Sequence, residues 1–299
     1  MFTGCGTALV TPFHKDSSVD EEALRRLVRR QINAGIDFLV PCGTTGESPT
    51  LTSAEQRRAV EITIEEAQPR KVPVLAGAGG NHTAHIIEMA REFQAMGANG
   101  ILSVAPYYNK PTQEGLFQHY KAIASAISLP IILYNIPGRT GVNIEPATVA
   151  RLAEINNIVG VKEASGNISQ MAVLLDLVPS SFLVLSGDDA ITLPLMALGG
   201  KGLISVSSNE IPAEMTRIVE LALQNDFSAA REIHRRYSRV MEANFIETNP
   251  GPVKAAMALM GLLEPVFRLP LVAPKPESLA KIRSALETVG LVPQVYAAR

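Results

Sequence analysis

The chain lacks most features of a secreted or membrane-spanning protein. Its 299 residues include two cysteines and no tryptophan, which excludes a framework of several disulfides and fits a reducing compartment. Cys5 and Cys42 both adjoin strand-like sequence, which predicts small buried side chains rather than nucleophiles. No apolar run approaches the roughly 18 residues that a membrane-spanning helix needs, and no basic segment opens the chain as in a signal peptide. We therefore expect a cytoplasmic protein.

An excess of charge of either sign is also missing. The chain has 27 Lys and Arg against 29 Asp and Glu, a formal net charge of −2, and a pI near 6.2. A surface for nucleic acid or anionic membrane needs a basic patch. A cluster of four arginines, Arg25, Arg26, Arg29 and Arg30, falls on a stretch with a regular apolar face. That pattern predicts a solvated helix face, so neither nucleic acid nor membrane is an expected partner.

What the sequence does have is a regular alternation. Short runs rich in β-branched residues alternate eight times with amphipathic stretches of helical period. The expected strands are residues 7–10, 38–41, 72–76, 100–104, 131–134, 159–162, 182–186 and 202–206. Eight strand–helix units joined by short loops predict an α/β fold of the closed (β/α)8 TIM-barrel type rather than an open doubly wound sheet.

The barrel, with the active site, is expected in residues 1–224, and a C-terminal helical extension in residues 225–299. Helical patterns at 227–245, 252–260 and 276–289 exceed what one strand–helix unit needs. Within the barrel, Ser53 and Gln56 have the spacing of a capping box, which predicts the start of a helix.

Lys162 stands where a lysine is unexpected. It follows the apolar run 158–161, which predicts a buried parallel strand, and it precedes a loop-like segment. Lysine is almost never fully buried without a reason, and burial disfavours its charged form. A neutral amine at the carboxyl end of a barrel strand can attack a carbonyl and form a Schiff base. The alternative is a lysine that reaches solvent or pairs with Glu163, but Tyr134 ends the preceding strand in the same way and favours the catalytic interpretation.

Polar segments follow the carboxyl ends of several expected strands, where barrel enzymes place their active sites. They are residues 43–48 (Gly-Thr-Thr-Gly-Glu-Ser), 106–111 (Pro-Tyr-Tyr-Asn-Lys-Pro), 134–141 (Tyr-Asn-Ile-Pro-Gly-Arg-Thr-Gly) and 186–189 (Ser-Gly-Asp-Asp). Each also has a purely structural interpretation: a turn, aromatics at a subunit interface, a surface arginine, and two aspartates that cap the next helix. Their combination at successive strand ends is what indicates an active site.

These motifs resemble the dihydrodipicolinate synthase family, one of the pyruvate-dependent class I aldolases, which also include N-acetylneuraminate lyase. The resemblance is carried by residues 43–47, 106–109, 134–141 and 160–166, the last reading Gly-Val-Lys-Glu-Ala-Ser-Gly. It extends to residues 249–254 and 268–271, and so covers essentially the whole chain.

The resemblance implies a Schiff-base enzyme. Lys162 would condense with the keto group of pyruvate to an imine and then an enamine, which attacks the aldehyde of L-aspartate 4-semialdehyde. The product, 4-hydroxy-tetrahydrodipicolinate, belongs to diaminopimelate and lysine biosynthesis. Because the iminium takes up the electron pair, no cofactor and no metal are expected. Of the five histidines, only His82 and His85 lie close together in the sequence.

The resemblance also implies a proton relay that crosses a subunit interface. Tyr134 would be linked to Thr44 and to Tyr108 of the partner subunit, which holds the phenol in place and connects it to solvent. A homo-oligomer is therefore expected, and the family suggests a tetramer built as a dimer of dimers.

Four further residues are implied in substrate binding. Thr45, Gly187 and the backbone of Ile204 would hold pyruvate. Arg139 would bind the carboxylate of the semialdehyde, because a guanidinium matches a planar carboxylate.

A cleft for feedback inhibition by L-lysine is implied by Asn81 and Tyr107. Lysine-sensitive members have a carboxylate where this chain has His85, and often a ring at the positions of Ser53 and Gln56. Without that carboxylate the ε-ammonium of lysine loses a charge-assisted contact. Weak or absent inhibition is therefore expected.

Three other functions stay open on the sequence. N-acetylneuraminate lyase and keto-deoxy sugar acid aldolases use the same lysine imine, and a catalytically silent barrel could serve as a ligand sensor. Those lyases typically carry serine where Thr44 stands and lack a match to Arg139, so Arg139 and residues 249–254 favour the synthase. Retention of the lysine, the tyrosines and the threonines disfavours the sensor.

Overall fold

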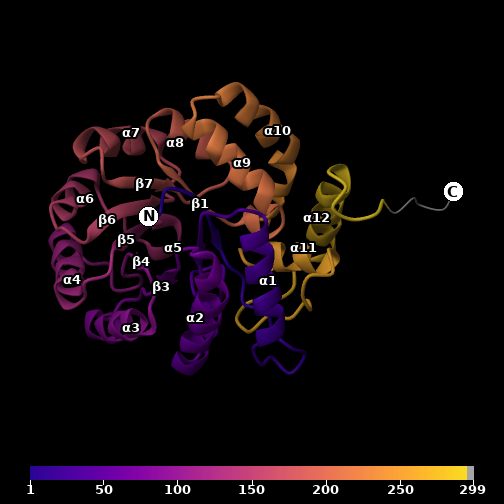
Figure 1. Ribbon diagram of the computed structural model, residues 1–299, viewed down its shortest axis with the longest axis horizontal. Helices are drawn as coiled ribbons and strands as arrows, with labels where there is room; N and C mark the ends of the chain where they lie inside the picture. Colours follow the sequence, from indigo (N-terminus) through magenta and orange to yellow (C-terminus); the bar gives the residue numbers. More distant parts are fainter. Residues whose placement is uncertain (295–299) are drawn as a thin grey trace.

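The structure, a computed structural model, describes residues 1–294. A barrel of eight parallel strands forms its centre, with helices around the outside (Figure 1). The strands are β1 (Gly4–Ala8), β2 (Phe38–Val40), β3 (Leu75–Gly77), β4 (Gly100–Val104), β5 (Ile131–Asn135), β6 (Ile158–Glu163), β7 (Leu183–Ser186) and β8 (Gly202–Ser205). The predicted (β/α)8 fold is confirmed.

The sheet closes on itself between β2 and β3. Its strands follow the order β2-β1-β8-β7-β6-β5-β4-β3. The remaining gap is joined by a bridge between Leu39 and Val74. Two amides donate across the same gap, Leu39 to the Pro73 carbonyl and Gly77 to the Pro41 carbonyl, both at 2.9 Å. This closure distinguishes the fold from an open doubly wound sheet, which has two unpaired edges.

Helices follow the strands around the barrel. In chain order they are α1 (Glu21–Asn33), α2 (Ser53–Ala67), α3 (Thr83–Met96), α4 (Gln113–Ala126), α5 (Pro137–Thr140), α6 (Pro146–Ala153), α7 (Ile168–Leu177), α8 (Thr192–Ala197), α9 (Pro212–Leu223), α10 (Phe227–Ala243), α11 (Gly251–Leu259) and α12 (Pro276–Thr288). Short 3-10 helices lie at Ser48–Thr50, Gln68–Arg70 and Ser207–Asn209. No helix within residues 1–294 is long and apolar enough to cross a membrane.

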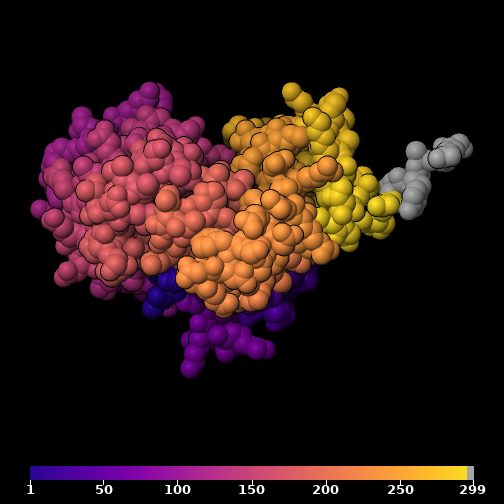
Figure 2. All heavy atoms as spheres, turned by 90° about the horizontal axis from the view of Figure 1, so that it is seen from above, coloured from indigo at the N-terminus to yellow at the C-terminus, as the bar shows by residue number. Residues whose placement is uncertain are grey.

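The helices at the C-terminal end lie together on one side of the barrel (Figure 1). Figure 2 shows them in orange to yellow, beside the magenta and pink part of the barrel. α10 packs against α9 and α12, and α11 packs against α12. The helices expected at 227–245, 252–260 and 276–289 are thus present. The division of the chain after residue 224 stays a prediction.

Alternate side chains of the strands fill the barrel interior, as the period of two requires. The interior cluster consists of Phe2, Ala8, Phe38, Val40, Leu75, Leu102, Ile132, Tyr134, Leu185 and Ile204. A larger apolar core lies between the outer face of the sheet and the helices. The polar side chains at the carboxyl ends of the strands therefore stand over a filled, apolar barrel.

The first strand begins earlier than the sequence predicts. Its β-branched run is in the expected segment 7–10, but β1 spans Gly4–Ala8. A Cβ on Gly6 would lie 2.1 Å from the ring of Phe38, so glycine is what lets β1 pass this large interior side chain. Glycine weakens the local signal for a strand, and the expected segment therefore starts too late.

The capping box of α2 lies one residue earlier than predicted. The N-cap is Thr52 rather than Ser53. Its Oγ1 accepts from the Glu55 amide at 3.2 Å, while Glu55 Oε2 accepts from the Thr52 amide at 2.8 Å. Gln56 instead donates to the Ser48 carbonyl at 2.9 Å. Both Ser and Thr can serve as the N-cap of a capping box, and both Glu and Gln can complete it, so the sequence alone does not select between the two adjacent pairs.

The arginine-rich face of α1 ties this helix to its neighbours. Arg25 and Arg29 both bind Glu66 of α2, at 2.9 and 2.6 Å. Arg30 is half-buried and donates to the Asn209 carbonyl at 2.8 Å. The prediction of a solvated face is therefore wrong for Arg30, which packs against the segment after β8.

Candidate active site

Lys162 and Tyr134 lie side by side at the carboxyl end of the barrel. They are register partners on β6 and β5, and each is 5 % exposed. The Nζ of Lys162 lies 4.3 Å from the centroid of the Tyr134 ring. Because Tyr134 belongs to the interior cluster, the amine is held inside the mouth of the barrel. A lysine that reaches solvent at the edge of a sheet does not fit this burial.

Glu163 does not pair with Lys162. Successive residues of a strand face opposite sides, and the Glu163 carboxylate lies on the outer side, buried under the helices. It accepts from Asn135 Nδ2 at 2.9 Å and from the Ser165 amide at 2.6 Å. The alternative of a structural Lys162–Glu163 pair is therefore wrong. Glu163 instead holds the loop that follows β6.

The residue after β7 shapes the space around the amine, and a residue of β8 lies near its level. A Cβ on Gly187 would lie 3.0 Å from Lys162 Cε and 2.6 Å from the Ala164 Cβ. Glycine therefore leaves the room that the lysine stem occupies. Ile204 is fully buried in the interior cluster on β8, two residues beyond Gly202, which is at the level of Lys162 through Leu185 of β7.

The loop after β2 carries Thr44 and Thr45. The turn is tight, since the Glu47 amide donates to the Thr44 carbonyl at 3.1 Å. Thr45 is buried, and its Oγ1 accepts a hydrogen bond from Asn249 Nδ2 at 3.0 Å. Thr44 is only half-buried and faces the cavity described below. The two neighbouring hydroxyls thus have different surroundings: that of Thr45 is buried against Asn249, and that of Thr44 faces the cavity.

A buried ion pair lies directly behind this loop. Glu47 has a left-handed φ of 54°, and its Oε1 lies 2.5 Å from the Nζ of Lys254 on α11. Both side chains are fully buried, and the ammonium lies 4.3 Å from the centroid of the Phe13 ring. Burial lowers the pKa of Lys254, while the attraction of Glu47 opposes that shift. Both charges stand inside motifs of the sequence, but one sequence alone gives no sign that they pair.

Arg139 stands at the rim of the barrel mouth. It lies on the single turn α5, which ends at Gly141 with a φ of 69°. Its side chain is exposed, and its Nη2 donates to the backbone carbonyl of Asn249 at 3.0 Å. Asn249 therefore contacts both Arg139 and Thr45. The sequence places Asn249 in a motif but does not indicate these contacts.

Two tyrosines stand in the loop after β4. Tyr108 is 90 % exposed and has a φ of 70°, and Tyr107 is 39 % exposed. Asn81 Nδ2 donates to the Tyr107 carbonyl at 3.3 Å, which holds the loop in place. An exposed Tyr108 and a buried Tyr134 are not brought together within one chain.

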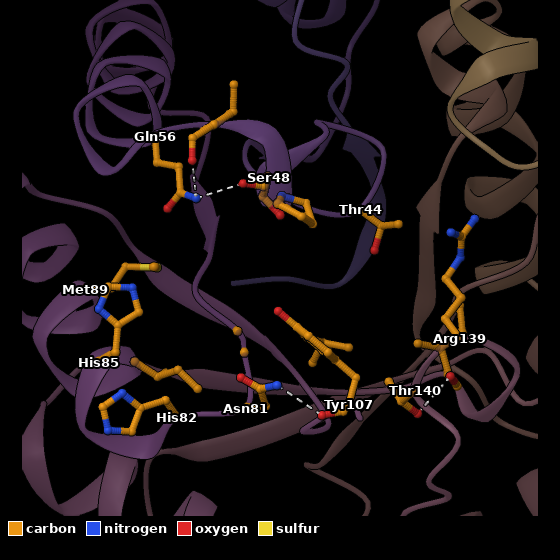
Figure 3. A pocket seen from close by; sticks show the side chains of 17 residues that line it. Thr44, Ser48, Gln56, Asn81, His82, His85, Met89, Tyr107, Arg139 and Thr140 are labelled. Carbon is orange, nitrogen blue, oxygen red and sulfur yellow. Dashed lines mark hydrogen bonds between the residues drawn. The ribbon is translucent and has the colours of Figure 1, made fainter. Parts of the chain in front are cut away.

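A cavity of 390 Å³ adjoins the barrel mouth (Figure 3). Its lining includes Thr44, Gln56, Asn81, His85, Tyr107 and Arg139. In Figure 3, Tyr107 lies between Thr44 on one side and the group of Asn81 and His85 on the other. Lys162 is not among the lining residues, so the cavity lies beside the amine rather than around it.

Four of the five residues expected in an inhibitor cleft therefore line one cavity. The fifth, Ser53, lines an adjoining hollow of 190 Å³ together with Gln56 and His85. Ser53 is the first residue of α2 and is not among the residues that line the larger cavity.

The two aspartates after β7 do not cap the next helix. α8 has Ile191 as its N-cap, without a side-chain hydrogen bond. Asp189 is buried and accepts from the Ser205 hydroxyl and from the amide and hydroxyl of Ser207. It therefore fastens the end of β8, while Asp188 accepts from an amide in the turn before α8. The predicted capping role is wrong because the carboxylate of Asp189 points to β8.

Other candidate groups have structural surroundings. Cys5 and Cys42 are buried, and burial raises the pKa of both thiols, that of Cys42 to about 12. Their prediction as small buried side chains is confirmed. His85 lies 3.9 Å from Glu88. Among residues 1–294, no three or more His, Cys, Asp or Glu side chains are grouped so as to hold a metal ion.

Comparison with known proteins gives one consistent result. Residues 1–289 match the dihydrodipicolinate synthetase family. A 4-hydroxy-tetrahydrodipicolinate synthase of Koribacter versatilis (strain Ellin345) is 53 % identical over 290 residues, covering 97 % of this chain and 96 % of the relative. One from Chloroherpeton thalassium (strain ATCC 35110 / GB-78) is 55 % identical over 291 residues, with coverage of 97 % and 96 %.

Solved structures agree. The dihydrodipicolinate synthase of Aquifex aeolicus superposes with a TM-score of 0.95 at 45 % identity, covering 97 % of this chain and 99 % of that one. A structure described as the first monomeric dihydrodipicolinate synthase variant gives a TM-score of 0.95 at 44 % identity, with coverage of 97 % and 98 %. Sequence and structure thus agree along nearly the full length, and the chain belongs to the dihydrodipicolinate synthetase family.

Proposed function

We propose that this protein condenses pyruvate with L-aspartate 4-semialdehyde to 4-hydroxy-tetrahydrodipicolinate, a lyase-class step of diaminopimelate and lysine biosynthesis in the cytoplasm. The observation that carries the proposal is Lys162, an amine 5 % exposed beside the Tyr134 ring in the barrel mouth. Membership of the family, and relatives named for this activity at more than half identity, support the choice of reaction.

The reaction begins at the amine. Lys162 Nζ, in its neutral form, attacks the C2 carbonyl carbon of pyruvate, and the carbinolamine loses water to give an iminium. Loss of a proton from C3 gives an enamine, and this carbon attacks the aldehyde of the semialdehyde. The amino group of the adduct then closes the ring at C2 and releases Lys162. Because the iminium takes up the electron pair, this route uses neither a cofactor nor a metal.

Pyruvate is held by groups around the amine. The Thr45 hydroxyl donates a hydrogen bond to the carboxylate. Gly187 and the backbone of Ile204 line the space for the keto carbon. The burial of Thr45 and Ile204, and the absence of a side chain at Gly187 beside Lys162 Cε, support this placement. A dry surrounding strengthens the contact between hydroxyl and carboxylate.

Arg139 binds the carboxylate of the semialdehyde. It stands at the rim with an exposed side chain, anchored to the Asn249 carbonyl through one nitrogen. The other nitrogens of its guanidinium fork can take a carboxylate in a charge-assisted contact. The second substrate therefore enters above the pyruvate imine, from the side of the 390 Å³ cavity.

Tyr134 moves protons at the imine, within a relay that needs a second subunit. Thr44 and Tyr108 of the partner subunit complete it. Tyr108 supports this role, since it has a left-handed φ of 70° and is 90 % exposed in the single chain, and strained backbone of this kind clusters at functional sites. We propose a homo-oligomer, a tetramer built as a dimer of dimers, whose minimal active unit is the dimer.

Inhibition by L-lysine is weak or absent in this proposal. The cavity offers Asn81 and Tyr107, but His85 stands where a carboxylate would meet the ε-ammonium. Losing one charge-assisted contact weakens binding at least about ten-fold. Half-inhibition below about a millimolar of lysine near neutral pH would contradict this expectation.

An assay with alternative aldehydes tests the substrates. The enzyme is given pyruvate with either L-aspartate 4-semialdehyde or N-acetylmannosamine, and pyruvate consumption is followed. Turnover with the semialdehyde alone supports the synthase. Turnover with N-acetylmannosamine or another sugar aldehyde would identify an N-acetylneuraminate lyase or a keto-deoxy sugar acid aldolase. No turnover with any aldehyde would point to a ligand sensor.

Borohydride trapping tests the nucleophile. Reduction in the presence of pyruvate should add one pyruvyl-derived group to the wild type, detected by mass spectrometry. Lys162→Ala should lose the adduct and fall below about a thousandth of the wild-type rate. Lys121→Ala, on the outer helix α4, should keep both. Undiminished labelling of Lys162→Ala would assign the imine to another lysine.

A further inference from the structure

Asn249 joins two parts of the site that serve different substrates in the proposed function. It is 4 % exposed and lies just before α11. Its side-chain Nδ2 donates to Thr45 Oγ1 at 3.0 Å, and its backbone carbonyl accepts from Arg139 Nη2 at 3.0 Å. One residue thus contacts both the hydroxyl proposed for pyruvate and the guanidinium proposed for the semialdehyde.

The direction of the first hydrogen bond decides what Thr45 can do. A threonine hydroxyl has one proton to donate, and a carboxylate can only accept. Because Thr45 Oγ1 accepts from Asn249, its own O–H is left to point elsewhere. The asparagine therefore prepares Thr45 as a donor, which is the role that binding of a substrate carboxylate requires.

Packing alone does not account for an asparagine at this position. Asn249 Oδ1 is buried and has no hydrogen-bond partner among residues 1–294. A buried acceptor without a partner destabilises the fold, and such groups are rare in proteins. A side chain kept despite this cost in stability points to a role in the site.

The surroundings fix the distance between Asn249 and Thr45. Lys254 lies on α11, five residues after Asn249, and Glu47 lies two residues after Thr45 in the loop. Lys254 and Glu47 form the buried ion pair described above. The Lys254 amide also donates to the Pro250 carbonyl at 3.0 Å, which continues the helix from the residue next to Asn249. The helix and the loop are therefore held together at two points, of which only Asn249 reaches a substrate-binding hydroxyl.

We propose that Asn249 is a positioning residue that aligns the two substrate carboxylates. Its side chain orients the Thr45 hydroxyl toward the pyruvate carboxylate, and its backbone carbonyl holds the Arg139 guanidinium for the carboxylate of the semialdehyde. The inference rests on the proposed function, and it assigns the relative placement of the two substrates to one residue of the segment before α11.

Asn249→Asp tests the side-chain part of the proposal. The aspartate has the same shape but no donor, and it accepts the Thr45 O–H that the substrate needs. The kcat/KM for pyruvate should fall about ten- to a hundred-fold, since a hydrogen bond to a charged group is lost. The kcat/KM for the semialdehyde at saturating pyruvate should fall less, because the backbone carbonyl that holds Arg139 is unchanged. Asn249→Ala should lie between Asn249→Asp and the wild type.

A double-mutant cycle with Thr45→Val shows whether Asn249 acts through Thr45. Once the hydroxyl is absent, Asn249→Asp should change the kcat/KM for pyruvate by less than about three-fold. Full additivity of the two substitutions, or an Asn249→Asp enzyme with unchanged kinetics, would overturn the proposal. If Asn249→Asp does not fold, the same cycle is run with Asn249→Ala, and additivity there has the same meaning.

A control and a second readout separate this inference from the proposed function. Asn157→Asp alters another asparagine amide, which donates to the Ala124 and Ile127 carbonyls before β6 at the opposite end of the barrel. It should lower the melting temperature without changing the kcat/KM for pyruvate. The pyruvate concentration for half-maximal borohydride labelling should rise in Asn249→Asp only. A wild type that cannot be labelled contradicts the proposed function, whereas equal labelling curves for wild type and Asn249→Asp contradict only this inference.

Discussion

A lysine inside the mouth of the barrel needs room for its side chain and a neighbouring group near its amine. One residue provides the room and another provides the neighbour. Gly187 leaves the room that the Lys162 stem fills, and Tyr134 places its ring 4.3 Å from the amine. The sequence predicts the positions of Lys162 and Tyr134 from the strand pattern. It gives no sign that the glycine directly after β7 is needed for the lysine to fit, because that requirement depends on the spacing of neighbouring strands.

Arg139→Ala should raise the KM for the semialdehyde about ten- to a hundred-fold, because a charge-assisted contact to a carboxylate is lost. The KM for pyruvate should change little, since in the proposed function pyruvate binds at Lys162 and Thr45 rather than at Arg139. Steady-state kinetics with each substrate varied in turn measures both. Arg151→Ala, on the outer helix α6 beside Glu114, is the matched control. Equal changes for both substrates would contradict the assignment, and an unaffected enzyme would favour the sugar-acid aldolases.

Glu210 makes the stability of the fold depend on pH. It is fully buried, and burial raises its pKa from 4.5 to about 8, although a hydrogen bond from Asn244 opposes the shift. Asp189 raises the pKa further and Arg30 lowers it. In the folded protein this carboxyl keeps a proton that the unfolded chain releases above its ordinary pKa. Its contribution to stability is therefore present at low pH and lost as pH rises toward about 8.

We expect the melting temperature of the wild type to fall between about pH 4.5 and pH 8, the ordinary and the raised pKa of Glu210, and Glu210→Gln to flatten this dependence. The glutamine keeps the neutral form at every pH. Differential scanning calorimetry across the range measures the slope, with Glu232→Gln on the exposed face of α10 as the control. Identical slopes for wild type and Glu210→Gln would show that the pKa of Glu210 is not raised.

At the scale of elements, the contact between α11 and the loop after β2 places residues that are far apart in the chain. The Glu47–Lys254 pair spans 207 positions, and Arg268 adds a further link, since its guanidinium binds Glu55 and lowers the pKa of that carboxyl to about 2. The helices after the barrel are thus attached to the segment that carries Thr44 and Thr45.

Lys254→Met should destabilise the protein by about 3–5 kcal/mol, because it leaves the Glu47 carboxylate buried without a partner. Glu47→Gln combined with Lys254→Met should recover part of this loss, since no buried charge then remains. Urea denaturation gives the free energies of unfolding. Arg217→Met breaks an exposed pair with Glu220 and should cost at most about 1 kcal/mol. An equally small effect of Lys254→Met would mean that water reaches the Glu47 carboxylate in the variant.

At the scale of the molecule, the site of one chain is incomplete in the proposed function. Tyr108→Phe should lower kcat by about a hundred- to ten-thousand-fold, the range for loss of one group in proton transfer. The phenylalanine keeps the ring and removes only the hydroxyl, so the melting temperature should change little. Sedimentation combined with activity measurements should find activity only in dimers or larger assemblies. A fully active monomer, or full activity of Tyr108→Phe, would contradict the relay.

The sequence by itself determined the eight strand–helix units, the helices that follow the barrel, and the placement of Lys162 and Tyr134 on neighbouring strands. These depend on periodicity, which is set by backbone geometry over a few residues and is therefore readable locally. Two errors of the sequence-based prediction were also local. The start of β1 was predicted too late because Gly6 weakens the strand signal, and the capping box was predicted at Ser53 instead of Thr52.

The tertiary structure alone decided which polar groups meet. Asn249 reaches Thr45 across 204 positions, Lys254 reaches Glu47, and Asp189 turns from its expected cap to the end of β8. Such pairings follow from the closure of the barrel and from the way the last helices pack against it. Burial then makes each pairing count, because a charge or a donor removed from water must find a partner inside the fold, wherever in the chain that partner lies.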